Sequence, residues 1–463
     1  MSFHEKVEQM KDEIINSTQE ILRIRSVKDD PKEGMPFGEG INQCLEHALS
    51  LSEKLGFQTK NFDGYAGHAE FGEGEEVVGI LVHLDVVPEG DNWTYPPYGG
   101  EIHQGKIYAR GTIDDKGPAM ACLYAMKAVK DSNLALNKKI RIIFGTDEES
   151  GWADMTYYLG NQKAPDVAFT PDADFPAIHA EKGILIFDLV KKLEPKQSEK
   201  GLFIHKIQGG NRANMVPDYC EAHITSHHSI LSGLEEFCRL TKAKIHAEVS
   251  GDITVLKSYG ISAHGSLPES GHNAISHLIL FLNGLDLAAG PMTEFIKFYC
   301  DKIGLEFNGQ SIGCGFEDEV SGKLIFNVGV IATDEAEIRT TVNIRYPVTY
   351  TTNQVYESIE GLLEDTEMKL VRGTHDMDPI YLPKDHELIK TLMSVYKKIT
   401  GDEREPIAIG GGTYARAMSN AVAFGPLFPG QPELAHQKDE YISVEDLLKI
   451  TEIYAEALYQ LAK

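Results

Sequence analysis

Cysteine is sparse in this sequence, and basic residues are outnumbered by acidic ones. The 463 residues include six cysteines, scattered with no CxxC pair. This distribution is typical of reduced thiols and excludes a disulfide framework. Lysine and arginine total 44 against 70 aspartates and glutamates, which gives a formal net charge of -26. A charge of this sign repels phosphate backbones and anionic lipid, so it argues against nucleic-acid and membrane partners.

Long apolar runs are also missing. No stretch approaches the roughly 20 apolar residues that a membrane-spanning helix needs. The first residues, MSFHEKVEQMKDE, are charged and lack the apolar segment of a secretory signal. We therefore expect a cytoplasmic protein.

The length of the chain predicts at least two compact units, each with its own core. Three short apolar runs, near residues 77, 139 and 166, are typical of buried strands. Between the first two lies a stretch with helical spacing that carries Pro118 in its opening turn. Apolar strands that alternate with helices indicate a parallel or mixed sheet covered on both faces. We therefore predict an α/β fold, a doubly wound mixed sheet, for residues 1–183 and 380–463.

Residues 184–379 have a different pattern. Their predicted strands alternate apolar and polar residues, and helical stretches occur near 230–243, 272–288 and 352–363. This alternation predicts a sheet with one solvated face and helices on the other. We interpret the segment as an inserted α+β domain.

Acidic residues and histidines gather where the predicted strands end. In open α/β sheets, ligands bind beyond the carboxyl ends of the strands, so the polar residues there matter most. Three acids follow one buried strand directly, in the stretch IIFGTDEESG. The whole strand-end set comprises His83, Asp85, Asp114, Asp115, Asp147, Glu148, Glu149, Asp172, Asp174 and His436.

Each of these residues has an ordinary explanation when it is taken alone. An acid before a helix usually caps it, and a single histidine is usually structural. Together, however, so many carboxylates on one sheet edge would repel each other unless cations neutralised them. Mixed imidazole and carboxylate ligands fit zinc, manganese or cobalt, whereas calcium prefers oxygen ligands only.

The adjacent Glu148 and Glu149 cannot easily bind one ion together, so we expect one to bind metal and its neighbour to face the bound water. Two divalent ions about 3.5 to 4 Å apart can lower the pKa of a shared water toward 7 and clamp a carbonyl oxygen. A carboxylate beside that water can take its proton and pass it to a leaving amine. This is the chemistry of amide hydrolysis.

Six motifs, in their order along the chain, resemble those of one hydrolase family. They are HLDVVPEGDNW, YARGTIDDKGP, TDEESG, NMVPD, SAHGSLPESGHNA and GGGTYAR. Together they resemble the two-metal peptidases that include carnosinase, aminoacylase, succinyl-diaminopimelate desuccinylase and folate-cleaving glutamate carboxypeptidase. The resemblance is strongest to the bacterial dipeptidase V branch and extends over nearly the whole chain, insert included.

The resemblance implies two divalent metal ions per chain, zinc first, with manganese or cobalt as alternatives. Asp114 would bridge the ions, with two further ligands completing each site. The implied ligands are His83 and Asp172 for one ion, and Glu149 and His436 for the other. Asp174 stays an alternative to Asp172, because only the alignment of the TPD triplet separates them.

Further roles follow from the same resemblance. Asp85 would hold the His83 ring, as metal-bound histidines usually require, and Glu148 would be the general acid and base. The insert would act as a lid whose His264 stabilises the oxyanion. The substrate's terminal carboxylate would be held by Asn214 and Arg345, for which an arginine fork is suited. Backbone N–H donors would come from Gly411, Gly412 and Thr413.

The size of the insert carries a further implication. Relatives with a lid of one β-α-β unit dimerise through it and borrow the oxyanion histidine from the partner, whereas the dipeptidase V branch has a doubled lid. Residues 184–379 are long enough for a doubled β-α-β unit, which implies a monomer.

The leading hypothesis is therefore a metal-dependent dipeptidase that acts on unblocked dipeptides through a metal-bridging water. An N-acyl amino acid hydrolase or a succinyl-diaminopimelate desuccinylase-like deacylase is the nearest alternative, with the same metals and a different acyl group. A catalytically silent binding module is a third hypothesis. Its mark would be the loss of Glu148 or of a ligand, and all of these residues are present.

Overall fold

The computed structural model describes residues 2–193, 201–225, 229–374 and 376–463. The chain divides into two compact units. The first comprises Met1–His179, Leu382–Ile407 and Gly412–Lys463, and the second comprises Ala180–Tyr381 and Ala408–Gly411. The insert that we predicted at 184–379 lies inside the second unit, but nothing in the sequence indicated that residues 408–411 return to it. Within the described ranges, no helix combines the length and apolar character needed to cross a membrane.

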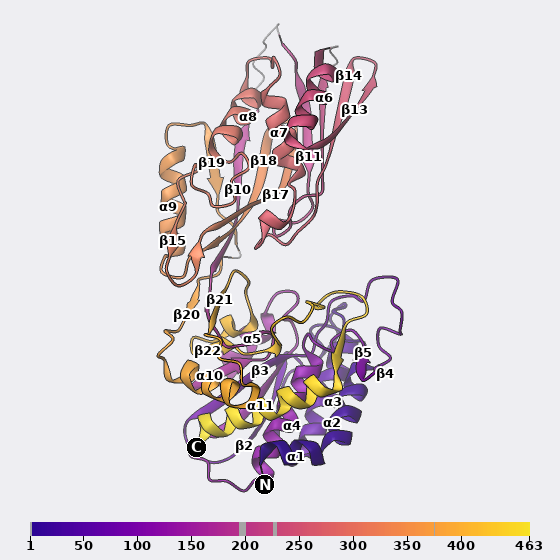
Figure 1. Ribbon diagram of the computed structural model, residues 1–463, viewed down its shortest axis with the longest axis vertical. Coiled ribbons are helices and arrows are strands. Elements are labelled where there is room, and N and C mark those ends of the chain that lie inside the picture. Colours follow the sequence, from indigo (N-terminus) through magenta and orange to yellow (C-terminus); the bar gives the residue numbers. More distant parts are fainter. Residues whose placement is uncertain (1, 194–200, 226–228, 375) are drawn as a thin grey trace. The chain divides into compact units, whose positions relative to one another are not determined.

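A mixed sheet forms the centre of the first unit, in the order β1-β2-β6-β3-β7-β22-β9 (Figure 1). The four central strands β6, β3, β7 and β22 are parallel, and antiparallel strands flank them on both sides. These strands are β1 (Gln58–Phe62), β2 (Ala66–Phe71), β3 (Val77–His83), β6 (Lys139–Gly145), β7 (Val167–Thr170), β9 (Ile178–Glu181) and β22 (Ala421–Ala423). All seven residues of β3 are buried, as its continuous apolar run predicts.

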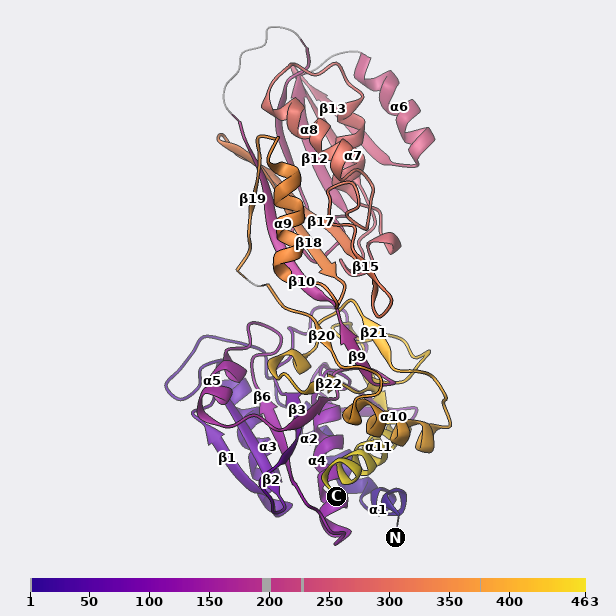
Figure 2. The same cartoon turned by 90° about the vertical axis from the view of Figure 1, so that its left-hand side faces the viewer.

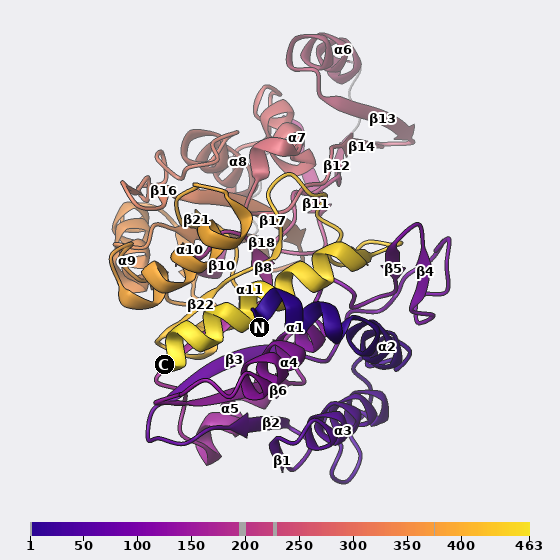
Figure 3. The ribbon, with the colours of Figure 1, turned by 60° about the horizontal axis from the view of Figure 1, so that its bottom comes forward.

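Helices cover the sheet of the first unit (Figure 3). α4 packs against α2 and α11, and α11 also contacts α1 and α10, whereas α3 and α5 pack against β1 and β2. The helices are α1 (Phe3–Gln9), α2 (Lys11–Leu22), α3 (Glu39–Lys54), α4 (Lys116–Asp131), α5 (Ala153–Asn161), α10 (Glu387–Thr400) and α11 (Val444–Ala462). The Ser443 hydroxyl caps α11 by accepting a hydrogen bond from the Asp446 N–H at 2.9 Å. The predicted α/β mixed-sheet fold is confirmed.

Short elements complete the first unit. A three-stranded sheet has the order β24-β5-β4, and β23 pairs with β8. These elements are β4 (Glu101–His103), β5 (Lys106–Tyr108), β8 (Ala173–Asp174), the 3-10 helix η2 (Tyr414–Ala417), β23 (Pro426–Leu427) and β24 (Tyr441–Ser443). β21 (Ile407–Ile409) pairs with β9, and its last two residues belong to the second unit.

The second unit is built on an antiparallel sheet of eight strands, in the order β13-β14-β12-β11-β17-β18-β10-β19 (Figure 2). The strands are β10 (Gly183–Lys192), β11 (Ile204–Gly209), β12 (Tyr219–Thr225), β13 (Lys244–Ser250), β14 (Ile253–Tyr259), β17 (Ile325–Thr333), β18 (Glu337–Tyr346) and β19 (Met368–Val371). Its helices are α6 (Ser229–Thr241), η1 (Pro268–Ser270), α7 (Ala274–Asn283), α8 (Pro291–Lys302) and α9 (Thr352–Leu363). The remaining strands are β15 (Glu317–Asp318), β16 (Gly322–Lys323) and β20 (Ile380–Tyr381).

This sheet consists of two similar halves. In one half β12, α6 and the edge strand β13 follow in sequence, and in the other half β18, α9 and the edge strand β19 do the same. In the first half β14 lies between β12 and β13, and in the second half β10 lies between β18 and β19. Each middle strand is antiparallel to both neighbours, so the two strands on either side of it are parallel to each other. The insert therefore holds two split β-α-β units, as its length implied.

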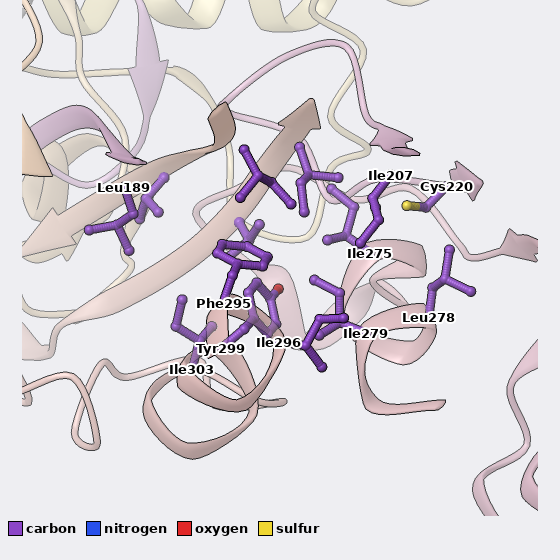
Figure 4. Close-up of a cluster of buried hydrophobic side chains, with 14 of the residues drawn as sticks. Leu189, Ile207, Cys220, Ile275, Leu278, Ile279, Phe295, Ile296, Tyr299 and Ile303 are labelled. Carbon is purple, nitrogen blue, oxygen red and sulfur yellow. The ribbon is translucent and has the colours of Figure 1, made fainter. Parts of the chain in front are cut away.

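One hydrophobic core lies under the sheet of the second unit. Figure 4 shows Ile275 and Ile279 of α7 gathered with Phe295 and Tyr299 of α8. Ile207 of β11 belongs to the same cluster and is fully buried. The inward residues of alternating strands thus meet the apolar faces of two helices, which fixes the register of the sheet.

Candidate active site

His83 lies at the carboxyl end of β3 and is fully buried. Its Nδ1 is 2.9 Å from the carbonyl oxygen of Asp85. Because a carbonyl can only accept, Nδ1 carries a ring proton, which leaves Nε2 as the nitrogen that a metal could bind. Nε2 lies 2.9 Å from Asp114 Oδ1 and 3.8 Å from Asp172 Oδ2, yet among the described residues it has no hydrogen-bond partner. A buried imidazole nitrogen beside two carboxylates fits a metal ligand.

Asp114 faces a second histidine with its other oxygen. His436 Nε2 lies 3.1 Å from Asp114 Oδ2 and 3.0 Å from Glu149 Oε1. Two groups of candidate ligands result, each with its ligand atoms within 4.8 Å of one another, and Asp114 belongs to both. They are His83, Asp114 and Asp172, and Asp114, Glu149 and His436. Asp174 belongs to neither group, and Asp114 is the one residue that the two groups share.

The electrostatics of these residues also suit a pair of cations. Burial raises the pKa of Glu149 and of Asp172, and it raises the pKa of Glu148 well above its usual value. Hydrogen bonds to Asp114 and Glu149 raise the pKa of His436 to about 11. Protons thus offset part of the negative charge when no cation is bound, and divalent ions could take their place. The donor set of two imidazoles and three carboxylates fits zinc, manganese or cobalt.

Asp85 holds the acidic turn that follows β6. Its Oδ1 accepts a hydrogen bond from the Glu148 N–H at 3.2 Å, and its Oδ2 accepts one from the Glu149 N–H at 3.0 Å. The same carboxylate is 3.5 Å from His83 Nδ1, farther than the Asp85 carbonyl. Asp85 therefore orients the His83 ring mainly through its main chain, and its side chain positions the two glutamates.

The other two strand-end acids have partners of their own. Asp147 Oδ1 forms an ion pair with Lys28 Nζ at 2.6 Å. Asp115 Oδ2 accepts a hydrogen bond from the His83 N–H at 3.1 Å. Both are therefore supports of the site, and neither belongs to a candidate ligand group.

Buried residues that the sequence analysis missed support the site. Asp154 accepts hydrogen bonds from the N–H groups of Thr146 and Asp147, at 2.7 and 3.1 Å, and from the Tyr414 hydroxyl. Burial raises the pKa of Asp154 to about 6. Tyr414 lies inside the motif GGGTYAR, and this position in a predicted site motif is a signal that could have pointed to the tyrosine. Asp154 has no such signal, because it resembles any acid in the first turn of a helix.

Glu440 was also missed. This fully buried carboxylate accepts hydrogen bonds from the N–H groups of Gly111, Ile113 and Asp114 and pairs with Arg110. It therefore fixes the loop that delivers Asp114 to the site. Burial raises the pKa of Glu440 to about 7.

The second unit carries Asn214 and Arg345, which we predicted to bind the substrate carboxylate, and His264, which we predicted to stabilise the oxyanion. The Gly265 N–H donates to the Asn214 carbonyl at 2.7 Å, and an isolated bridge joins Met215 to His264. Arg345, on β18, is 5% exposed, and its Nε donates to Asn343 Oδ1 at 3.1 Å. Burial lowers the pKa of His264, and the charge of Arg345 lowers it further. His264 and Arg345 thus lie close enough to interact.

The glycine-rich loop is divided between the units. Gly411 belongs to the second unit, whereas Gly412 and Thr413 belong to the first. Thr413 Oγ1 caps η2 by accepting a hydrogen bond from the Ala415 N–H at 3.3 Å. The role of these residues as backbone donors stays a prediction.

Sequence comparisons agree with the chemistry of this site. Residues 79–460 match the model of peptidase family M20/M25/M40. The "Putative dipeptidase YtjP" of Bacillus subtilis (strain 168) is 45% identical, with 100% of both chains covered. The "Putative dipeptidase" of Staphylococcus epidermidis (strain ATCC 12228 / FDA PCI 1200) is 36% identical over 99% of this chain and 98% of its own length.

Solved structures share the fold at low sequence identity. Human carnosine dipeptidase 1 superposes with a TM-score of 0.59 at 16% identity, covering 99% of this chain and 98% of its own. Aminopeptidase PepT from Bacillus cereus ATCC 10987 has a TM-score of 0.59 at 14% identity and covers 98% and 99%. Both pairs match over nearly their whole lengths, so the similarity concerns the fold of both units.

Proposed function

Because the chain belongs to peptidase family M20/M25/M40, we propose that it is a metal-dependent dipeptidase that hydrolyses the peptide bond of unblocked dipeptides. The observation that carries this proposal is the pair of ligand groups that share Asp114. The relatives named as dipeptidases, which match the whole length of the chain, favour this substrate class over acylated amino acids.

Five residues would hold two divalent ions in this proposal. Asp114 would bridge them, and the other ligands would be His83 and Asp172 for one ion and Glu149 and His436 for the other. The bound ions would supply a water of lowered pKa and a clamp for the carbonyl oxygen of the substrate. We propose zinc first, with manganese or cobalt as alternatives, because all three suit this donor set.

Glu148 would be the proton carrier. Its backbone is held by Asp85, and its carboxyl group is buried beside the ligand groups. A carboxylate there can take a proton from the attacking water and deliver it to the amine that leaves. Its neighbour Glu149 contacts His436 and is therefore assigned to the metal.

The second unit would contribute the substrate contacts. His264 would donate a hydrogen bond to the oxyanion of the tetrahedral intermediate. Arg345 and Asn214 would hold the free carboxylate of the dipeptide, since a guanidinium suits a carboxylate. Gly411, Gly412 and Thr413 would add backbone donors. A carboxylate clamp of this kind accounts for a preference for short substrates with a free carboxyl end.

We further propose that the enzyme is a monomer in the cytoplasm. The doubled insert supports the first point, because the two split β-α-β units of one chain would take the place of two single units from a pair of chains. The six cysteines, none of which forms a disulfide, are consistent with the second.

The test is hydrolysis of a substrate panel by protein that has been stripped of metal and then reloaded with zinc or manganese separately. The panel contains Ala-Ala, carnosine, a tripeptide, and N-acetyl and N-succinyl amino acids. We expect cleavage of the free dipeptides only, and only with metal. Preferential cleavage of the acylated amino acids would instead assign the chain to the deacylases.

A further inference from the structure

The His264 ring makes two contacts with Ser266, and both involve the same ring nitrogen. Nδ1 lies 2.5 Å from Ser266 Oγ and 3.3 Å from the Ser266 backbone nitrogen. A backbone N–H can only donate, so a hydrogen on Nδ1 would point at the hydrogen of the Ser266 N–H and the two would repel each other. The backbone contact therefore favours an accepting Nδ1, and the Ser266 hydroxyl, which is the closer of the two groups, can donate its hydrogen to that nitrogen.

The loop that carries these residues is held in place against Asn214. The Gly265 N–H donates to the Asn214 carbonyl at 2.7 Å, and the Leu267 N–H donates to the His264 carbonyl at 2.9 Å. A Cβ added at Gly265 would lie 2.9 Å from the carbonyl carbon of Asn214, so only glycine permits this approach. Ser266 is thus fixed relative to the ring by the backbone of its own turn.

We propose that Ser266 is a positioning residue that fixes the tautomer of His264, with the ring proton on Nε2. This inference rests on the proposed function, in which His264 donates a hydrogen bond to the oxyanion. A neutral imidazole has a single N–H, so the nitrogen that carries the proton decides whether the ring can donate in the required direction. No other described residue hydrogen-bonds to Nε2, which leaves that N–H available to a substrate.

The ring is neutral near pH 7, because burial and the charge of Arg345 both lower the pKa of His264. An imidazolium would carry protons on both nitrogens and would not need a selected tautomer. The Ser266 contact is therefore useful only to a neutral histidine donor, which is the state that this environment favours.

The tautomer can be measured directly in the full chain. Protein labelled with ¹⁵N-histidine and loaded with zinc is studied by long-range ¹H–¹⁵N correlation, with His264→Gln used to assign the signals. We expect a protonated Nε2 and an unprotonated Nδ1 in the wild type. Ser266→Ala should move the population toward Nδ1–H, and Ser266→Thr, which keeps the hydroxyl, should restore it. A wild-type ring protonated on Nδ1, or an unchanged ratio in Ser266→Ala, would overturn the proposal.

Kinetics separate this role from a purely structural one. Ser266→Ala should lower kcat for a dipeptide about tenfold with KM changed less than about twofold, because the lost interaction acts in the transition state. Ser262→Ala is the matched control: its hydroxyl donates to the Val216 carbonyl at 3.2 Å in the same loop and does not touch the ring. We expect this control to keep both the wild-type tautomer and the wild-type kcat.

The two readouts also distinguish the inference from the proposed function. The tautomer is measured without substrate, so a protein that cleaves no dipeptide still tests the role of Ser266. A shifted tautomer with unchanged kcat would support the role of Ser266 and would overturn the oxyanion role of His264.

Discussion

Arg110 and Glu440 form an ion pair that solvent barely reaches. Arg110 Nη1 lies 2.6 Å from Glu440 Oε2, and the two side chains are 2% and 0% exposed. The same carboxylate accepts hydrogen bonds from the N–H groups of the loop that ends at Asp114. Removing one partner of a buried pair leaves an uncompensated charge. Because the same carboxylate also holds the loop, its loss should disturb both the ion pair and the position of Asp114.

Glu440→Gln should destabilise the protein and weaken its hold on metal. The amide keeps one acceptor oxygen but leaves the Arg110 charge unpaired, and we expect a loss of about 3 to 5 kcal/mol in the free energy of unfolding. Urea denaturation and metal titration measure the two effects. Glu360→Gln, which breaks the exposed pair with Arg372, is the control and should cost less than about 1 kcal/mol. Equal stability of the two variants would contradict the role of the buried pair.

Glu148→Gln should separate proton transfer from metal binding. We expect metal content to stay at the wild-type level and kcat to fall by several orders of magnitude, because the amide cannot take the proton of the attacking water. Plasma emission spectroscopy and turnover of Ala-Ala measure the two quantities. Glu149→Gln should instead lose part of the metal, since Glu149 belongs to a ligand group. Turnover retained by Glu148→Gln would remove Glu148 as the base.

Asp172→Asn and Asp174→Asn should differ in metal content. Asp172 Oδ2 is 3.8 Å from His83 Nε2, and Asp174 lies outside both ligand groups. We expect Asp172→Asn to lose about one of two ions per chain and Asp174→Asn to keep both, because a carboxamide is a weak ligand for these metals. The reverse order of metal contents would transfer the ligand role to Asp174.

His68 should make stability depend on pH. Burial, with help from the charge of Arg141, lowers the pKa of His68 to about 4. A histidine whose pKa is lower in the folded state stabilises the protein fully above its unfolded pKa of about 6.5, and this stability is lost as pH falls toward 4. The loss should reach about 3 kcal/mol at roughly 1.4 kcal/mol per pH unit.

The measurement is the denaturation midpoint between pH 7.5 and pH 4 for the wild type and for His68→Gln. The variant should show the smaller decline over this range. His246→Gln, at an exposed position of the second unit, controls for the removal of a histidine and should decline like the wild type. A decline that is the same in all three proteins would show that folding does not lower the pKa of His68.

Part of the site followed from local patterns. The carboxyl ends of parallel strands meet at one sheet edge, so runs such as the one that ends at His83 indicated which polar residues would gather. The local patterns did not show which of these residues would face the candidate metal ligands. Asp147, Glu148 and Glu149 are consecutive, yet the structure pairs Asp147 with Lys28 and brings Glu149 to His436. Side-chain directions after a strand depend on the turn, and this turn is set by Asp85 and Asp154 through backbone hydrogen bonds.

The sequence by itself determined the α/β character of the first unit, the doubled insert and the residue types of the site, because hydrophobic periodicity and motif order are local properties of the chain. Only the tertiary structure decided which oxygen of Asp114 faces which histidine and that Glu440 supports the Asp114 loop. It also decided that residues 408–411 join the second unit. These relationships join positions that lie far apart in sequence, and no local propensity encodes a distance through space.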